Sequence, residues 1–188
     1  RDYKRLDEDE PTARRLYYKE SRDLITAYHK NDHEIGWLSD RAELLKRQAA
    51  TATRASATRL RHNVRAVRLY ERNFGSRSFE PLNPLRLNLE FYGVRISVVP
   101  DLHVLEDGKE KLVKLDFGVK APEPALTKII SQATFEAAAG HVRGLTSSSI
   151  LYLDVGRGKE YRGARAGART MREIEAACLN IAALWEGI

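Results

Sequence analysis

Apolar residues in the first third of the chain recur at the spacing of an α-helix. They do so from Leu16 to Tyr28, after a start signal at Pro11-Thr12. A second helical stretch begins at Ser39, a residue that favours the N-cap position, and ends at Gly75. The spacing fits either one long helix or two, so the sequence predicts a helical region over residues 1–77.

The pattern changes from a helical period to alternation after Pro81 and Pro84, which mark a linker. Residues 86–91 alternate between apolar and polar, and Tyr92-Gly93 then turns the chain. Two extended runs follow, 94–106 and 109–119, joined at Asp107-Gly108. That dipeptide is typical of a two-residue hairpin turn, so we expect three strands here.

The last third of the chain combines both patterns. Residues 125–138 have helical spacing up to Gly140, and residues 149–155 form a short apolar run of strand type. Residues 156–169 are rich in glycine and arginine. Thr170 and Glu173 form a capping-box pattern for a final helix. The order predicts an α/β (α+β) fold: a small mixed sheet flanked by helices in residues 78–188, with an N-terminal helical extension.

Composition narrows the class of protein further. The 188 residues are 43% hydrophobic, enough for a buried core, and contain one cysteine, Cys178. A disulfide framework and a cysteine-rich zinc site are therefore excluded. No run approaches the roughly 20 apolar residues of a membrane span. We expect a soluble, cytoplasmic protein that does not insert into a membrane; the oligomeric state is left open.

The positive charge is concentrated in two segments. The chain carries a net charge of +6, and residues 41–77 hold ten basic and two acidic side chains. Residues 156–169 hold five basic and one acidic. A nucleic acid, DNA in the first instance, is the simplest partner for such a pattern, although a solvated basic face is an ordinary alternative. Candidate phosphate contacts are Arg54, Arg61, Arg65, Arg68, Arg157, Lys159, Arg162 and Arg165.

The hairpin register predicts where acidic side chains meet. If Asp107 and Gly108 are the turn residues, Glu106 faces Lys109 and the strands continue in that register. One face is then wholly apolar, with the pairs Ile96–Val119, Val98–Phe117, Pro100–Leu115 and Leu102–Val113. On the other, exposed face, Asp101 lies opposite Lys114 and diagonal to Asp116.

Two carboxylates at that spacing can share one hard divalent cation. Mg²⁺ prefers one or two carboxylates together with water and phosphate oxygens. Lys114 or Lys120 would add positive charge beside an attacked phosphate. The ordinary alternative is an Asp101–Lys114 ion pair on a solvated strand face.

The two strands also resemble a known family. The first contains Pro100-Asp101 and the second contains Asp116-Phe117-Gly118, and a helix, a strand and a helix follow. This arrangement resembles the PD-(D/E)XK nuclease superfamily, especially its RecB-like branch. The resemblance implies a restriction-endonuclease-like fold and Mg²⁺-dependent cleavage of DNA. It implies that Asp101 and Asp116 hold the metal, that Gln132 supports the site, and that Glu71 is a possible further ligand.

One position departs from the family pattern. The family lysine stands two residues after the acid, where this chain has Gly118. Either Lys114 or Lys120 takes over that role, or the protein is a catalytically inactive nuclease-fold module that binds nucleic acid. A third alternative is a basic regulatory protein that binds an acidic protein partner.

Overall fold

A computed structural model of the chain describes residues 16–163 and 168–186, so the helix start expected at Pro11 lies outside it. The chain divides into two compact units, Arg1–Arg77 and Ser78–Ile188. The predicted fold class is confirmed, because helices and a mixed sheet are both present.

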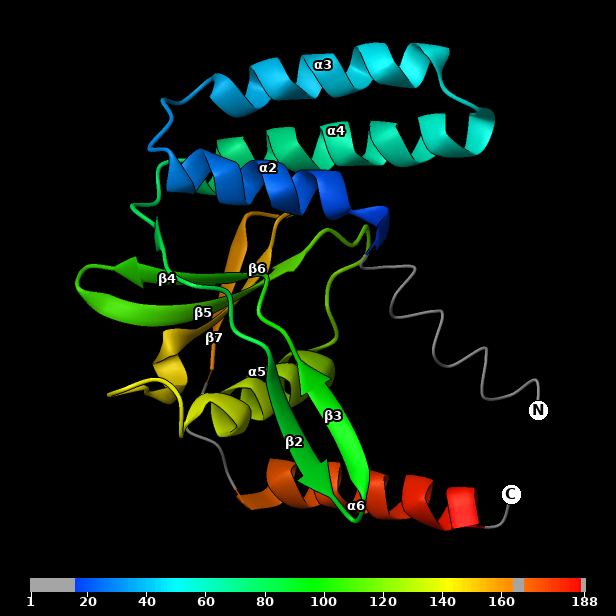
Figure 1. The fold of residues 1–188 in the computed structure, drawn as a ribbon, viewed down its shortest axis with the longest axis vertical. Coiled ribbons are helices and arrows are strands. Elements are labelled where there is room, and N and C mark those ends of the chain that lie inside the picture. The colour runs from blue at the N-terminus through cyan, green and yellow to red at the C-terminus, as the bar shows by residue number, and fades with distance from the viewer. Residues whose placement is uncertain (1–15, 164–167, 187–188) are drawn as a thin grey trace. The chain divides into compact units, whose positions relative to one another are not determined.

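The described part of the first unit, from residue 16 onward, contains the helices α2 (Lys19–Lys30), α3 (Trp37–Thr51) and α4 (Arg54–Phe74). The second helical stretch is therefore two helices, which meet at Ala52-Thr53 and lie side by side (Figure 1). Buried side chains from each helix form the core, among them Ile25, Leu38 and Val67.

The start of α3 differs from the prediction. The N-cap residue is Gly36, whose φ of 107° favours glycine, and Ser39 lies inside the first turn. The Glu71 carboxylate of α4 caps the helix instead, accepting the N–H groups of Gly36 (2.8 Å), Leu38 (3.1 Å) and Ser39 (3.3 Å). Glu71, a possible metal ligand by resemblance, is thus engaged as a helix cap.

The second unit is built on a five-stranded mixed sheet in the order β1-β4-β5-β6-β7. The strands are β1 (Glu80–Pro81), β4 (Leu102–Glu106), β5 (Lys109–Asp116), β6 (Ile150–Asp154) and β7 (Lys159–Arg162). Only β5 and β6 are parallel; the other neighbours are antiparallel. Two further strands, β2 (Leu87–Phe91) and β3 (Val94–Val98), form a separate hairpin.

The expected strand pairing is confirmed near the turn and wrong beyond it. Glu106 pairs with Lys109 and Leu102 with Val113, as the Asp107-Gly108 turn predicts. The pairs Ile96–Val119 and Val98–Phe117 do not form, because the 94–106 run breaks after Val98 and β3 pairs with β2. The Tyr92-Gly93 turn, with φ of 54° and 76°, joins β2 and β3 as a hairpin of neighbouring strands.

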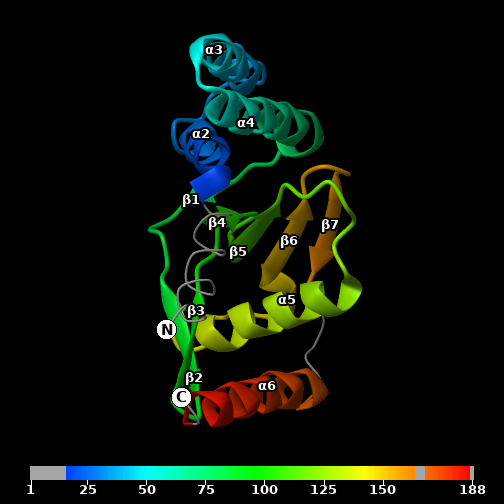
Figure 2. The same cartoon turned by 90° about the vertical axis from the view of Figure 1, so that its right-hand side faces the viewer.

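Two helices of this unit share its core with the β2–β3 hairpin. Figure 2 shows α5 (Pro124–Ala138) and α6 (Ala168–Glu186) beside that hairpin. Ala133 and Ala137 of α5, Ile174 and Cys178 of α6 and Leu87 of β2 belong to one buried cluster.

The structure differs from the sequence pattern at the start of α6 and just before β6. Thr170, expected as a cap, lies inside α6, and a short 3₁₀ helix, η1 (Ser147–Ser149), precedes β6. Within residues 16–163 and 168–186, no helix is both long enough and apolar enough to cross a bilayer.

Candidate functional site

One face of the five-stranded sheet carries the candidate site, because β5 and β6 present alternate residues to it. Lys114 pairs with Tyr152 and Asp116 with Asp154 in the parallel register, and partners in register share a face. Asp116 and Asp154 are the last residues of their strands. Their carboxylates therefore lie at one edge of the sheet, the edge where open α/β sheets bind ligands.

Asp101 and Lys114 meet as the sequence predicts. The ammonium of Lys114 lies 3.1 Å from Oδ2 of Asp101. The same oxygen accepts the backbone N–H of Leu115 at 2.8 Å. The expected exposure is wrong, however: the Asp101 side chain is only 5% exposed. It is buried because its carboxylate sits against the β5 backbone at the point where β4 begins.

Asp116 is held by two donors. Its Oδ1 accepts the backbone N–H of Gly118 at 2.7 Å, and its Oδ2 accepts the Tyr152 hydroxyl at 2.9 Å. Burial raises the pKa of Tyr152, and Asp116, Asp154 and Asp101 raise it further. All three carboxylates therefore act electrostatically on this phenol, which keeps its proton and remains a donor.

Asp154 is a third acid that the sequence analysis missed. It is fully buried and accepts the guanidinium of Arg157 at 3.1 Å and the Arg157 backbone N–H at 3.1 Å. Arg157 also donates to the Val119 carbonyl on the loop after β5. The sequence did contain a signal for this residue, because Asp154 is an acid at the end of an apolar run of strand type. We call Asp101, Lys114, Asp116, Tyr152, Asp154 and Arg157 the strand-end cluster.

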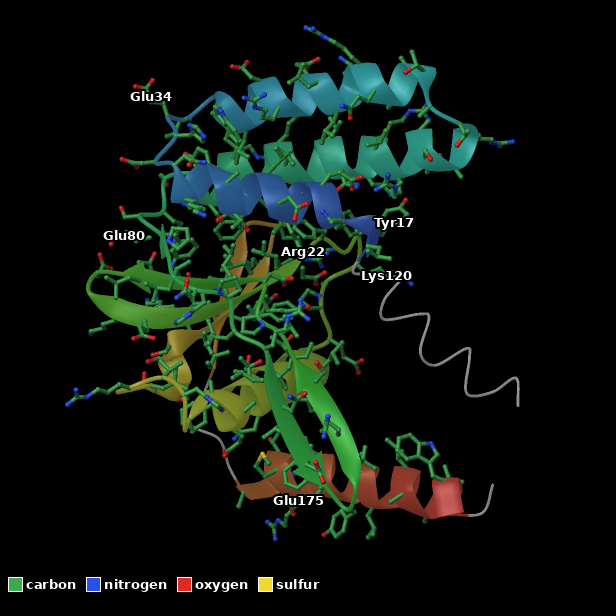
Figure 3. The ribbon with its side chains drawn as sticks, viewed as in Figure 1. Tyr17, Arg22, Glu34, Glu80, Lys120 and Glu175 are labelled. Carbon is green, nitrogen blue, oxygen red and sulfur yellow. The ribbon has the colours of Figure 1, made fainter. Side chains whose placement is uncertain are left out.

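Neither of the other two predicted catalytic side chains joins this cluster through a described contact. Lys120 is exposed on the loop between β5 and α5 (Figure 3). Gln132 is buried on α5, where its amide donates to Glu136 at 2.6 Å along the same helix. Of the two lysines considered, Lys114 is the one beside the acids.

Gly118 occupies a crowded position. A Cβ atom at this residue would lie 2.9 Å from Oδ1 of Asp116, which is closer than real Cβ contacts. A side chain here therefore requires a small shift of the Asp116 carboxylate, which accepts the Gly118 N–H in this conformation. Gly118 thus leaves room for the observed position of Asp116.

The segment rich in glycine and arginine, residues 156–169, has fewer unpaired positive charges than its composition suggests. Arg157 is ion-paired with Asp154, and Arg162 with Glu160 in β7. Lys159 is exposed at the start of β7, opposite Asp154. Arg165 lies outside the described residues. The segment is also part of the sheet rather than a simple loop.

The four predicted arginines of α4 form a regular row together with Arg72. Arg54, Arg61, Arg65, Arg68 and Arg72 are all exposed, and their spacing places them on one side of the helix. We call this row the α4 arginine stripe. Leu60, Val67, Tyr70 and Phe74 are buried on the other side. Arg68 pairs with Glu43 of α3, while Arg54, Arg61 and Arg65 have no ion pair within the described part of the chain.

The strand-end cluster has oxygen donors of the type Mg²⁺ prefers, but they do not fit a resident ion as they stand. Each carboxylate already accepts a cation or a hydrogen bond from the chain. Over residues 16–163 and 168–186, no three His, Cys, Asp or Glu side chains are grouped to hold a metal ion. A divalent cation would have to displace Lys114, Tyr152 or Arg157.

Comparisons with protein-family models, curated proteins and solved structures found no match to this chain. The resemblance to nucleases therefore depends on the residues and their arrangement alone.

Proposed function

We propose that this protein binds nucleic acid and that its Ser78–Ile188 unit is a non-catalytic module of PD-(D/E)XK-like design. One observation carries the non-catalytic part of the proposal: all three acids of the strand-end cluster are engaged by the chain's own donors. Lys114 and Arg157 supply two positive charges against three negative ones, so little charge is left for a divalent ion to neutralise.

The nucleic-acid part of the proposal is supported by charge and by element order. The net charge of +6 is concentrated in the first unit, where α4 exposes arginines without ion pairs among the described residues. In the second unit, a hairpin is followed by a helix and by a strand parallel to the hairpin's second strand. That order agrees with the nuclease resemblance.

Cleavage of nucleic acid with Mg²⁺ is the second candidate function. It is favoured by the position of Asp116 and Asp154, which end neighbouring parallel strands at the edge where ligands bind. It is disfavoured by the burial of Asp101 and by Gly118, which replaces the family lysine.

A metal titration separates the two functions. Binding to labelled duplex and single-stranded DNA is measured in EDTA, Mg²⁺ and Mn²⁺, and the same samples are run on gels to detect cleavage. We expect similar binding in EDTA and in Mg²⁺ once ionic strength is matched, with no cleavage. Metal-dependent cleavage that Asp116→Asn abolishes, and that Asp107→Asn retains, would overturn the proposal. Asp107 is the matched control because it is exposed on the turn of the same hairpin.

A further inference from the structure

The α4 arginine stripe has the dimensions of an extended binding surface. From Arg54 to Arg72 the helix rises by roughly 27 Å, at about 1.5 Å per residue. Successive arginines of the stripe are three, four or seven residues apart, so their side chains leave the same side of the helix one after another. A line of this length exceeds a single small anion and suits a polymer with regularly spaced charges.

The positive charge of the stripe is only partly neutralised. Glu43 of α3 pairs with Arg68, and Arg72 donates to its neighbour Asn73 at 3.4 Å. In the described residues, no carboxylate forms an ion pair with Arg54, Arg61 or Arg65. These three exposed guanidinium groups can therefore each hold an external oxyanion, in the two-pronged geometry that phosphate accepts.

The chemistry of the exposed side also distinguishes between kinds of polyanion. Single-stranded nucleic acid is normally held by aromatic side chains on which the bases stack. The aromatic residues of α4, Tyr70 and Phe74, are both buried on the opposite side of the helix. Lipid insertion would need an exposed apolar face, whereas Leu60, Val64 and Val67 of α4 are buried and Leu69 is half-buried.

We propose that the α4 arginine stripe binds the phosphate backbone of a nucleic-acid duplex and makes no base-specific contact. This inference rests on the proposed nucleic-acid function and names the form of nucleic acid and the surface that binds it. Arginines spaced along one line match phosphates repeated along a strand. Since the contacts are to phosphates, affinity falls steeply with salt and is similar for unrelated sequences.

The test uses the whole chain and the double variant Arg61→Gln/Arg65→Gln. Binding to a labelled short duplex and to one of its separated strands is measured by fluorescence anisotropy between about 50 and 200 mM NaCl. Wild type should bind the duplex more tightly. The double variant should lose about tenfold or more in duplex affinity, and its salt slope should become shallower by about two.

Two further variants keep the test specific. Arg86→Gln/Arg95→Gln removes two exposed arginines from the second unit. The duplex affinity of this variant should stay within about twofold of wild type, because surface substitutions away from the binding site have small effects. Arg61→Lys/Arg65→Lys keeps the charge and should retain most of the salt slope. Circular dichroism checks that each variant keeps its helices.

The outcomes separate the inference from the function on which it rests. Wild type that binds neither duplex nor single strand contradicts the proposed function itself. Duplex binding that the Arg61→Gln/Arg65→Gln variant leaves unchanged, or a preference for the single strand, overturns only the duplex-backbone inference. Tighter binding to poly-glutamate than to the duplex also overturns it, in favour of an acidic protein partner.

Discussion

Two groups of basic residues in this protein are used in opposite ways. Lys114 and Arg157 of the second unit are paired with Asp101 and Asp154 inside the strand-end cluster. Arg61 and Arg65 of the first unit are exposed, with no ion pair among the described residues. Basic residues are thus paired with buried acids in one unit and exposed to solvent in the other. A count of charges along the sequence does not distinguish the paired residues from the unpaired ones. The distinction depends on which side chains surround each basic residue in the folded structure.

The largest effect that would sharpen this contrast comes from Arg157→Met. It leaves the fully buried Asp154 carboxylate without its guanidinium partner, and we expect a loss of about 3 kcal/mol in the free energy of unfolding. Denaturant unfolding measures it. Glu90→Gln, an exposed carboxylate of the same unit, should change stability by less than about 0.5 kcal/mol. Equal effects of the two variants would mean that the Asp154 pair contributes little.

Lys114→Met should have the next largest effect. It leaves the nearly buried Asp101 carboxylate without its ammonium partner, at a cost of about 2 kcal/mol, reduced because Lys114 is partly exposed. A double-mutant cycle with Asp101→Asn measures the coupling. If the two substitutions add without coupling, the internal ion pair is not what stabilises this part of the sheet.

Glu71→Ala tests an internal carboxylate in the basic unit. Loss of the cap on α3 should cost about 1.5 kcal/mol, because three N–H groups lose their acceptor. Glu34→Ala, an exposed acid next to the same helix, is the control and should be nearly neutral. Unfolding followed by circular dichroism gives both values. A neutral Glu71→Ala would argue that solvent satisfies the α3 terminus equally well.

Tyr152→Phe should have the smallest effect, about 1 kcal/mol, from the lost hydrogen bond to Asp116. The raised pKa of Tyr152 adds a pH signature. Its folded pKa lies above its unfolded value near 10, so the related stability is complete below about pH 10 and is lost as the pH rises further. The difference in stability between wild type and Tyr152→Phe should therefore shrink above pH 10; a difference independent of pH would contradict this assignment.

The sequence predicted the elements better than their partners. Asp107-Gly108 fixed the β4–β5 register because a two-residue turn leaves the strands no other alignment. Tyr92-Gly93 is a second turn of the same kind. Across this turn Val94–Val98 pair with β2 and not with β5. The predicted hairpin around Asp107-Gly108 wrongly included residues 94–98, which form β3 of the preceding hairpin. The Asp101–Lys114 contact survived because it lies close to the correctly predicted turn.

Local periodicity by itself determined the α4 arginine stripe, because residues three, four and seven apart share one side of any α-helix. Periodicity also predicted that residues 16–28 and 39–74 are helical, and composition gave the excess of positive charge. Only the tertiary structure decided that Asp154 and Tyr152 lie beside Asp116. That proximity requires β6 to pair in parallel with β5 across an intervening helix, and Tyr152 and Asp116 are 36 residues apart. No local spacing rule spans such a distance, since parallel strands are joined by a long crossover and not by a tight turn.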